Sequence, residues 1–303
     1  MASTKSYATA QAVSTERGKC TSGISGRGRG RPGATRVRSA DFCPSRLRPD
    51  PASFTGAAAA VWSRPERTGV SDLKHVSVDQ IQTFAIIAPV LLFSMVAHEY
   101  AHGYAALKQG DPTAQQLGRL TWNPLKHIDP FLTIILPMMT FFLGNFIFGG
   151  AKPVPVSPQN YREYRRGDII VSLAGVATNA VLVVLLALLI IPVGMLGQSM
   201  PGAFRVASLV QEMLRWGIIF NLILVFFNLL PIPPLDGSHV VKHLLPPAWQ
   251  IRYVDFGRYG LLVLVGLLTI GRDILTAWLA PMWAILRMVL SMVSPYLLPS
   301  VLS

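Results

Sequence analysis

Residues 80–107 read QIQTFAIIAPVLLFSMVAHEYAHGYAAL, an apolar run with a single charged residue, Glu99. The run is long enough to cross a bilayer as one helix, because a span needs about 20 mainly apolar residues. Near its end it also carries His98 and His102. A carboxylate at the centre of a bilayer costs roughly 2.5 kcal/mol or more, and such residues usually have a function. This stretch therefore predicts both a membrane fold and a chemical site.

The spacing of His98, Glu99 and His102 is typical of a zinc peptidase helix. Residues four apart lie on one helix face, so both imidazoles can bind one zinc ion. Glu99 can then act as general base on a water that the metal activates. The competing interpretation, three polar interfacial residues without a shared role, does not explain their place inside an apolar span. We predict His98 and His102 as ligands of one Zn²⁺ per chain and Glu99 as catalytic.

A third ligand must come from elsewhere, because a catalytic zinc has three protein ligands and one open position. Both cysteines, Cys20 and Cys43, lie far from the hydrophobic segments, which leaves histidine and carboxylate ligands. The best candidate is Asp236, within NLLPIPPLDG at residues 228–237. Its prolines cannot continue a helix and would turn the aspartate back towards the bundle. The alternative is a helix-capping carboxylate in a loop.

Four further apolar stretches follow the first one, and two of them have the length of a membrane span. They cover residues 130–148, 169–193, 206–230 and 259–298. Pro137 interrupts the first of these, whereas the second and third are long enough to span. The last is broken by two charges and a proline, which leaves one or two spans open. We predict an all-α polytopic membrane protein, a helical bundle of about 4–6 hydrophobic segments.

Five motifs in this order resemble those of the site-2 protease family of intramembrane metalloproteases. They are HEYAH at 98–102, GRLTWNPLKHIDP at 118–130, GGAKPVPV at 149–156, AGVATN at 174–179 and NLLPIPPLDG at 228–237. The second and third are similar to those of the compact bacterial members without appended domains. The resemblance covers roughly residues 80–250, and it departs from the pattern at Val176, where the family commonly has proline.

The resemblance implies roles for residues that spacing alone does not assign. It implies that His98, His102 and Asp236 hold zinc and that Glu99 activates water. It further implies that Asn179 and Asn228 are catalytic, steadying the substrate or the oxyanion; the alternative for both is helix–helix hydrogen bonding. Structural roles are expected for two other pairs of residues. His127 and Asp129 are expected to hold the loop after the first span, and His239 and His243 to lie around the site or at the interface.

The shared metal constrains the topology of the bundle. His102 lies near the C-terminal end of its segment, and Asp236 follows the C-terminal end of residues 206–230. These two segments must therefore run parallel, with an odd number of crossings between them. We predict that residues 130–148 are re-entrant rather than spanning. Residues 149–156 are expected to form an irregular hairpin that lines the site. The resemblance implies that the edge of this hairpin holds the substrate as an added strand.

Positive charge predicts the orientation of the site. Residues 108–168 carry seven Lys/Arg, whereas residues 194–205 carry one. Positive-inside counting places the active site towards the cytoplasm, in the inner (plasma) membrane of a cell, with an organelle membrane as the alternative.

Composition separates the chain into two parts. Hydrophobic residues make up 51% and charged residues only 14%, against about 25% charged in a soluble protein. Residues 1–75 differ, with 13 Lys/Arg, 5 Asp/Glu and no apolar periodicity. We predict a disordered basic tail there, spurious or processed, before a membrane-embedded metalloprotease domain at residues 76–303. Alternatives for the tail are binding of nucleic acid or anionic lipid and an organelle transit peptide.

Together these patterns predict an intramembrane zinc metalloprotease that cleaves membrane proteins in or near their transmembrane segments. Its partners would be a membrane-protein substrate and the lipid bilayer, with no nucleic acid. The alternatives are a membrane transporter and a non-catalytic zinc-binding membrane protein. The intact Glu99 argues against a non-catalytic protein. We see no inverted repeats in the sequence that would favour a transporter. Substrate identity and oligomeric state stay open.

Overall fold

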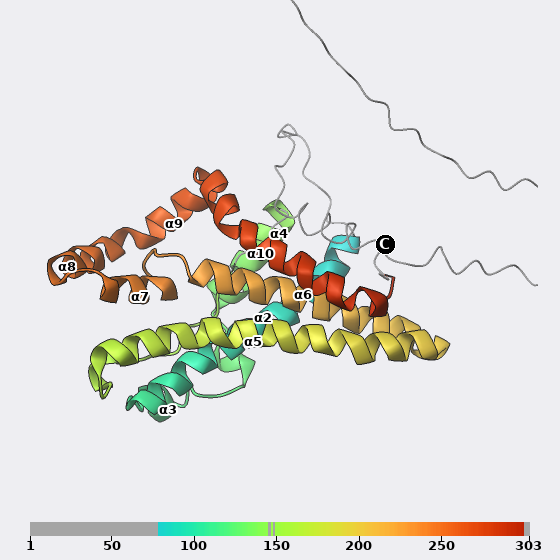
Figure 1. Cartoon of the computed structure of the whole chain (residues 1–303), viewed down its shortest axis with the longest axis horizontal. Helices are drawn as coiled ribbons and strands as arrows, with labels where there is room; N and C mark the ends of the chain where they lie inside the picture. The colour runs from blue at the N-terminus through green and yellow to red at the C-terminus, as the bar shows by residue number, and fades with distance from the viewer. Residues whose placement is uncertain (1–77, 145–146, 148, 300–303) are drawn as a thin grey trace, which may run out of the picture. The chain divides into compact units, whose positions relative to one another are not determined.

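The computed structural model of the protein describes residues 78–144, 147 and 149–299. The expected basic tail at residues 1–75 lies outside the described residues. Within the described part every regular element is helical and no strand is assigned (Figure 1). The prediction of an all-α membrane protein is confirmed at this level.

Four helices in the described part are long and apolar enough to cross a membrane. They are α2 (Val78–Gln109), α5 (Tyr164–Ser199), α6 (Phe204–Asn228) and α10 (Arg272–Val293). The first three contain or largely overlap the stretches predicted to span. The last resolves the question left open at the C-terminal end, because α9 (Gly260–Thr269) has only 10 residues. About 20 are needed to span, so α10 is the one crossing there among the described residues.

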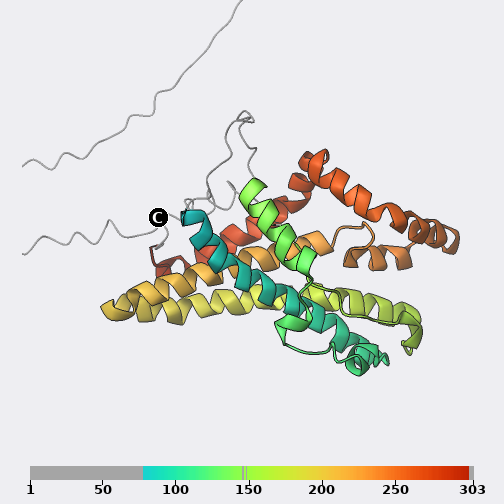
Figure 2. The same ribbon diagram turned by 180° about the vertical axis from the view of Figure 1, so that it is seen from behind.

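The long helices pack around α5 and α6, which lie against one another along most of their length (Figure 2). The helix α2 contacts both of them, and α10 covers α6. In Figures 1 and 2, α2 and α6 run in the same direction and α5 runs against them, as the shared metal required. Aliphatic side chains from all four helices fill the interior: Ile87, Ile190, Ile218, Ile219, Met282 and Leu286 are each at most 2% exposed.

The stretch predicted to be re-entrant forms a short, irregular helical element. A π-helical segment, η3 (Pro130–Ile135), leads into α4 (Leu136–Gly144). Asp129 caps it by accepting hydrogen bonds from the backbone N–H groups of Phe131 and Leu132. The apolar part, Pro130–Phe142, has fewer residues than a span needs. This length agrees with the prediction that it does not cross the membrane.

Two buried polar residues hold the loop between α2 and η3. This loop includes α3 (Thr113–Gln116) and η2 (Pro124–Lys126). A separate short element, η4 (Pro158–Asn160), lies between α4 and α5. His127 is fully buried and its Nε2 lies 2.9 Å from the Thr121 carbonyl oxygen. Asp111 accepts hydrogen bonds from Thr113, from the Ser157 N–H and from Asn160. The prediction that His127 holds this loop is confirmed.

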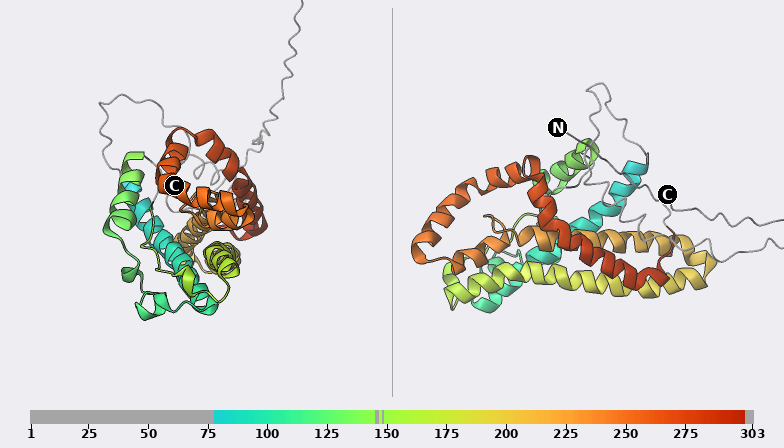
Figure 3. Two further views of the ribbon diagram at one scale, coloured as in Figure 1. Left: turned by 90° about the vertical axis from the view of Figure 1, so that its left-hand side faces the viewer. Right: turned by 45° about the horizontal axis from the view of Figure 1, so that its top comes forward.

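A chain of short helices leads from α6 to α10 (Figure 3). It comprises α7 (Asp236–Leu244), α8 (Pro247–Phe256), η6 (Gly257–Tyr259) and α9. The Tyr253 hydroxyl donates to the Pro231 carbonyl over 2.9 Å. The backbone of Gly260 lies so close to Pro233 that a side chain there would collide with the Pro233 carbonyl. The segment from α8 to the start of α9 therefore packs on the proline turn, residues 231–234, that precedes Asp236.

Candidate metal centre

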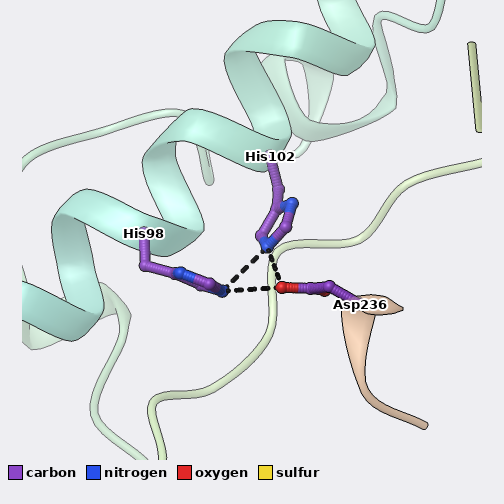
Figure 4. Close-up of side chains that lie close together, drawn as sticks. All are labelled: His98, His102 and Asp236. Atoms are coloured by element: carbon purple, nitrogen blue, oxygen red, sulfur yellow. Dashed lines mark hydrogen bonds and ion pairs between the residues drawn. The ribbon is translucent and has the colours of Figure 1, made fainter. Parts of the chain in front are cut away.

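Three side chains from α2 and α7 meet at one point. His98 and His102 project one helical turn apart from α2, and Asp236 is the first residue of α7 (Figure 4). The Asp236 Oδ2 atom lies 3.2 Å from His98 Nε2 and 3.5 Å from His102 Nε2. The two imidazole Nε2 atoms are 2.9 Å apart. In the described residues these three make up the group able to hold a metal ion through one ligand atom each.

The spacing of these atoms fits a tetrahedral zinc ion. Zinc ligands lie about 2.0–2.1 Å from the metal, so neighbouring ligand atoms of a tetrahedron are about 3.3 Å apart. The observed separations of 2.9, 3.2 and 3.5 Å lie on both sides of that value. The residue types also fit, because two imidazoles and one carboxylate are an established donor set for catalytic zinc with an open fourth position.

Hydrogen bonds behind the imidazoles turn their Nε2 atoms towards this point. His102 Nδ1 lies 2.7 Å from the Val171 carbonyl oxygen. Because a carbonyl only accepts, Nδ1 must carry a proton, and in the neutral imidazole the lone pair is then on Nε2. Such a bond from the distal ring nitrogen is what orients metal-binding histidines.

His98 receives a similar contact from Asn179, which is fully buried on α5. The Asn179 amide Nδ2 lies 3.1 Å from His98 Nδ1, while Asn179 Oδ1 has no hydrogen-bond partner in the described part of the chain. Rotating the carboxamide by 180° keeps its shape and presents Oδ1 to a protonated Nδ1. In that arrangement Asn179 supports His98 as a ligand through its Nε2 atom.

The candidate third ligand, Asp236, presents one buried carboxylate oxygen. Oδ2 of Asp236 has no solvent exposure and no aligned hydrogen-bond donor among the described residues, and it faces the two Nε2 atoms. Burial acts to raise the pKa of the Asp236 carboxyl, but the adjacent His102 and His98 outweigh it and hold that pKa below its usual value. A carboxylate with an unsatisfied buried oxygen is suited to bind a cation.

Gly175 on α5 lies directly against the two imidazoles. A Cβ at this position would lie 2.5 Å from His102 Nε2 and 2.5 Å from His98 Cε1. Only a residue without a side chain lets α5 approach the histidines this closely. Gly175 was not predicted as a site residue, although it belongs to the AGVATN motif. The signal that could have revealed it is a glycine inside an apolar span, which permits close approach of a neighbouring helix.

Glu99 is held by a strap of chain, residues 150–156, that has no regular secondary structure. The Val154 N–H donates to Glu99 Oε2 over 2.8 Å. Arg119 fixes the strap from the other side, because its guanidinium donates to the carbonyls of Lys152 and Pro153 at 3.1 and 3.3 Å. The strap lies where a hairpin was expected, but no strand pairing is assigned in it.

The remaining predicted residues lie in different surroundings. Asn228 is the last residue of α6, and its Nδ2 donates to the Leu224 carbonyl of the same helix at 3.0 Å. His239 and His243 are not part of the three-residue group. Both contact the buried carboxylate of Asp168 on α5.

Comparison with known proteins agrees with this geometry. The family model described as peptidase family M50 matches residues 86–270. "Putative zinc metalloprotease YwhC" of Bacillus subtilis is 37% identical over 183 residues, which are 60% of this chain and 78% of that protein. "Putative zinc metalloprotease Rip2" of Mycolicibacterium smegmatis is 34% identical over 193 residues, 62% of this chain and 68% of that protein. No solved structure matches this chain.

Proposed function

Because the chain belongs to peptidase family M50, the site-2 protease family, we propose that His98, His102 and Asp236 hold its catalytic zinc and that Glu99 is its general base. The protein is an intramembrane zinc metalloprotease. The convergence of three ligand atoms from α2 and α7 carries the assignment of these residues. Family membership leaves the transporter and the non-catalytic alternatives without support.

The chain's own residues divide the hydrolysis between them. Zinc, when bound, supplies a Lewis acid that lowers the pKa of water and polarises the substrate carbonyl. The Val154 N–H occupies Glu99 Oε2, so we assign the proton transfers to Oε1. Glu99 takes a proton from water as the water oxygen bonds to the carbonyl carbon. It gives that proton to the amide nitrogen as the C–N bond breaks.

Three groups on α5 keep the ligands in place during this cycle. The Val171 carbonyl orients His102, Asn179 orients His98, and Gly175 lets α5 lie against both rings. We therefore assign Asn179 to ligand orientation. Asn228 lies at the end of α6, one turn before the proline turn, and we propose that its side chain contacts the substrate after leaving the Leu224 carbonyl.

The substrate is a membrane protein, as the family implies. A peptide bond inside a transmembrane helix is hydrogen-bonded within that helix, so the substrate must unwind before cleavage. We propose that it does so beside the strap, residues 150–156, which lies against Glu99. Residues 76–303 then form one membrane-embedded metalloprotease domain.

We propose that the site faces the cytoplasm from a plasma membrane. Residues 108–168, from the end of α2 to the start of α5, carry seven Lys/Arg, whereas residues 194–205, around the α5–α6 connection, carry only Arg205. Single cysteines at exposed Gln116 and Gly202, in a background without Cys20 and Cys43, test this orientation. An impermeant thiol reagent applied from outside should label Gly202→Cys and spare Gln116→Cys; the reverse pattern excludes the proposed orientation.

The catalytic assignment is tested by cleavage of a model transmembrane substrate in liposomes, with bound zinc counted in the same samples. We expect Glu99→Gln to keep about one zinc per chain. Its cleavage rate should fall roughly 100-fold or more, the usual contribution of a general base. Glu163→Gln is the matched control, because that glutamate is 69% exposed at the start of α5. Two results would overturn the assignment. One is cleavage by Glu99→Gln at the wild-type rate, and the other is a zinc count showing that the purified wild-type protein binds no zinc.

A further inference from the structure

A buried carboxylate joins α5 to the helix that carries the third ligand. Asp168 is 3% exposed. Its Oδ1 lies 3.0 Å from His239 Nδ1, and its Oδ2 lies 2.5 Å from Lys242 Nζ and 2.7 Å from His243 Nε2. All three partners belong to the nine-residue helix α7, which starts at Asp236. One side chain of α5 therefore contacts α7 at three places.

These contacts fix the rotation of α7 about its own axis. Residues three, four and seven apart lie on one side of a helix, so His239 and His243 share a face with Asp236. Holding the two histidines against α5 turns the Asp236 carboxylate in the same direction. The Arg165 guanidinium adds a further bond from α5, donating to the His243 carbonyl over 2.9 Å.

The same face of α5 contacts the other two ligands. Asp168, Val171, Gly175 and Asn179 are spaced by three or four residues and so form one stripe along the helix. The Val171 carbonyl contacts His102, Gly175 lies against both histidines, and Asn179 contacts His98. A single helix thus sets the positions of all three ligands relative to one another.

We propose that Asp168 is a positioning residue for the metal centre, which holds α7 so that Asp236 meets His98 and His102 at zinc-ligand distance. This inference rests on the proposed function. Asp168 does not bind the metal; it acts through α7. In Asp168→Asn only one acceptor oxygen remains and its charge is gone, so the carboxamide cannot satisfy His239, Lys242 and His243 together, and α7 is held less firmly. Residues behind metal ligands typically change metal affinity by about 10–100-fold when replaced.

Zinc affinity of the purified full chain, measured by competition with a chromogenic chelator, tests this role. We expect Asp168→Asn to weaken affinity at least tenfold. The matched control is Asp111→Asn, because Asp111 is also a buried carboxylate with several hydrogen bonds but none to α7. The control should bind zinc within about twofold of the wild type, a range well below the expected effect.

The absorption spectrum of the Co²⁺-substituted protein gives a readout that does not depend on activity or stability. Its d–d bands report the ligand geometry, so they should shift in Asp168→Asn and stay unchanged in Asp111→Asn. If Asp168→Asn does not fold, His239→Gln removes one of the three contacts and should give a smaller shift in the same direction.

Two results would overturn the role of Asp168. One is an unchanged spectrum and affinity in both Asp168→Asn and His239→Gln. The other is an equal loss in Asp168→Asn and Asp111→Asn, which would make the effect a general loss of stability. Failure of the proposed function looks different, because the wild-type protein itself would then bind no metal at this site.

Discussion

Replacing Gly175 by alanine adds one methyl group at the point where α5 touches both histidines. The new Cβ would lie 2.5 Å from His102 Nε2 and from His98 Cε1. Ordinary contacts between such atoms are about 3.5–4.0 Å, so the rings or the helix must move by about 1 Å. Metal–ligand distances tolerate about 0.2 Å. A displacement several times larger should remove at least one histidine from the metal.

The size of the effect follows from this displacement. A misplacement of about 1 Å costs roughly 100-fold in rate, and we expect a loss of at least that size in cleavage. The assay is cleavage of a transmembrane substrate in liposomes, with zinc content and thermal unfolding of the metal-free protein measured alongside. Zinc content should fall together with activity.

Gly266→Ala is the matched control, because Gly266 lies in α9 and a Cβ there has no neighbour within 4 Å in the described structure. Alanine in place of glycine stabilises a helix by roughly 0.5–1 kcal/mol when nothing collides. The control should therefore keep its zinc, its activity and its fold. Full zinc content and wild-type cleavage in Gly175→Ala would refute the proposed contact between α5 and the histidines.

Two further predictions concern the loop that follows α2. Burial acts to raise the pKa of the Asp111 carboxyl, but hydrogen bonds from Asn160, Ser157 and Thr113 outweigh it and hold that pKa below its ordinary value of 3.8. The ionised Asp111 carboxylate therefore stabilises the fold above a pH of about 4. This contribution is lost as the pH falls through the pKa of Asp111 in the folded protein. Thermal unfolding should show Asp111→Asn less stable than wild type by about 2 kcal/mol at pH of about 7 and by less at pH of about 3; a difference independent of pH contradicts this. Arg119→Met should lower the cleavage rate about 10-fold without loss of zinc, because the strap that holds Glu99 loses its anchor; zinc loss in this variant would contradict that reason.

The sequence predicted those parts of the site that depend on local geometry. His98, Glu99 and His102 lie on one helix, so their spacing alone brings the two imidazoles together. Asp236 was found through the prolines before it, which end α6 and start α7. The spans were equally visible, because length and apolar character define them without knowledge of their partners.

Contacts between separate helices could not be predicted in the same way. Nothing in the sequence around Asp168 shows that its partners lie more than 70 positions further on, in α7. Gly175 carries no chemical group, and its importance follows only from how closely α5 approaches α2. These residues depend on packing, which a single sequence does not reveal.

The three proposed ligands lie on two segments, α2 and α7, that leave the ribosome well apart, with α5 and α6 between them. When α2 first enters the membrane, it has two imidazoles and a carboxylate but not yet the aspartate that completes the set. The nascent protease therefore has no competent active site while its second half is still being made. On this assignment the order of synthesis itself delays activity until α7 has joined α2.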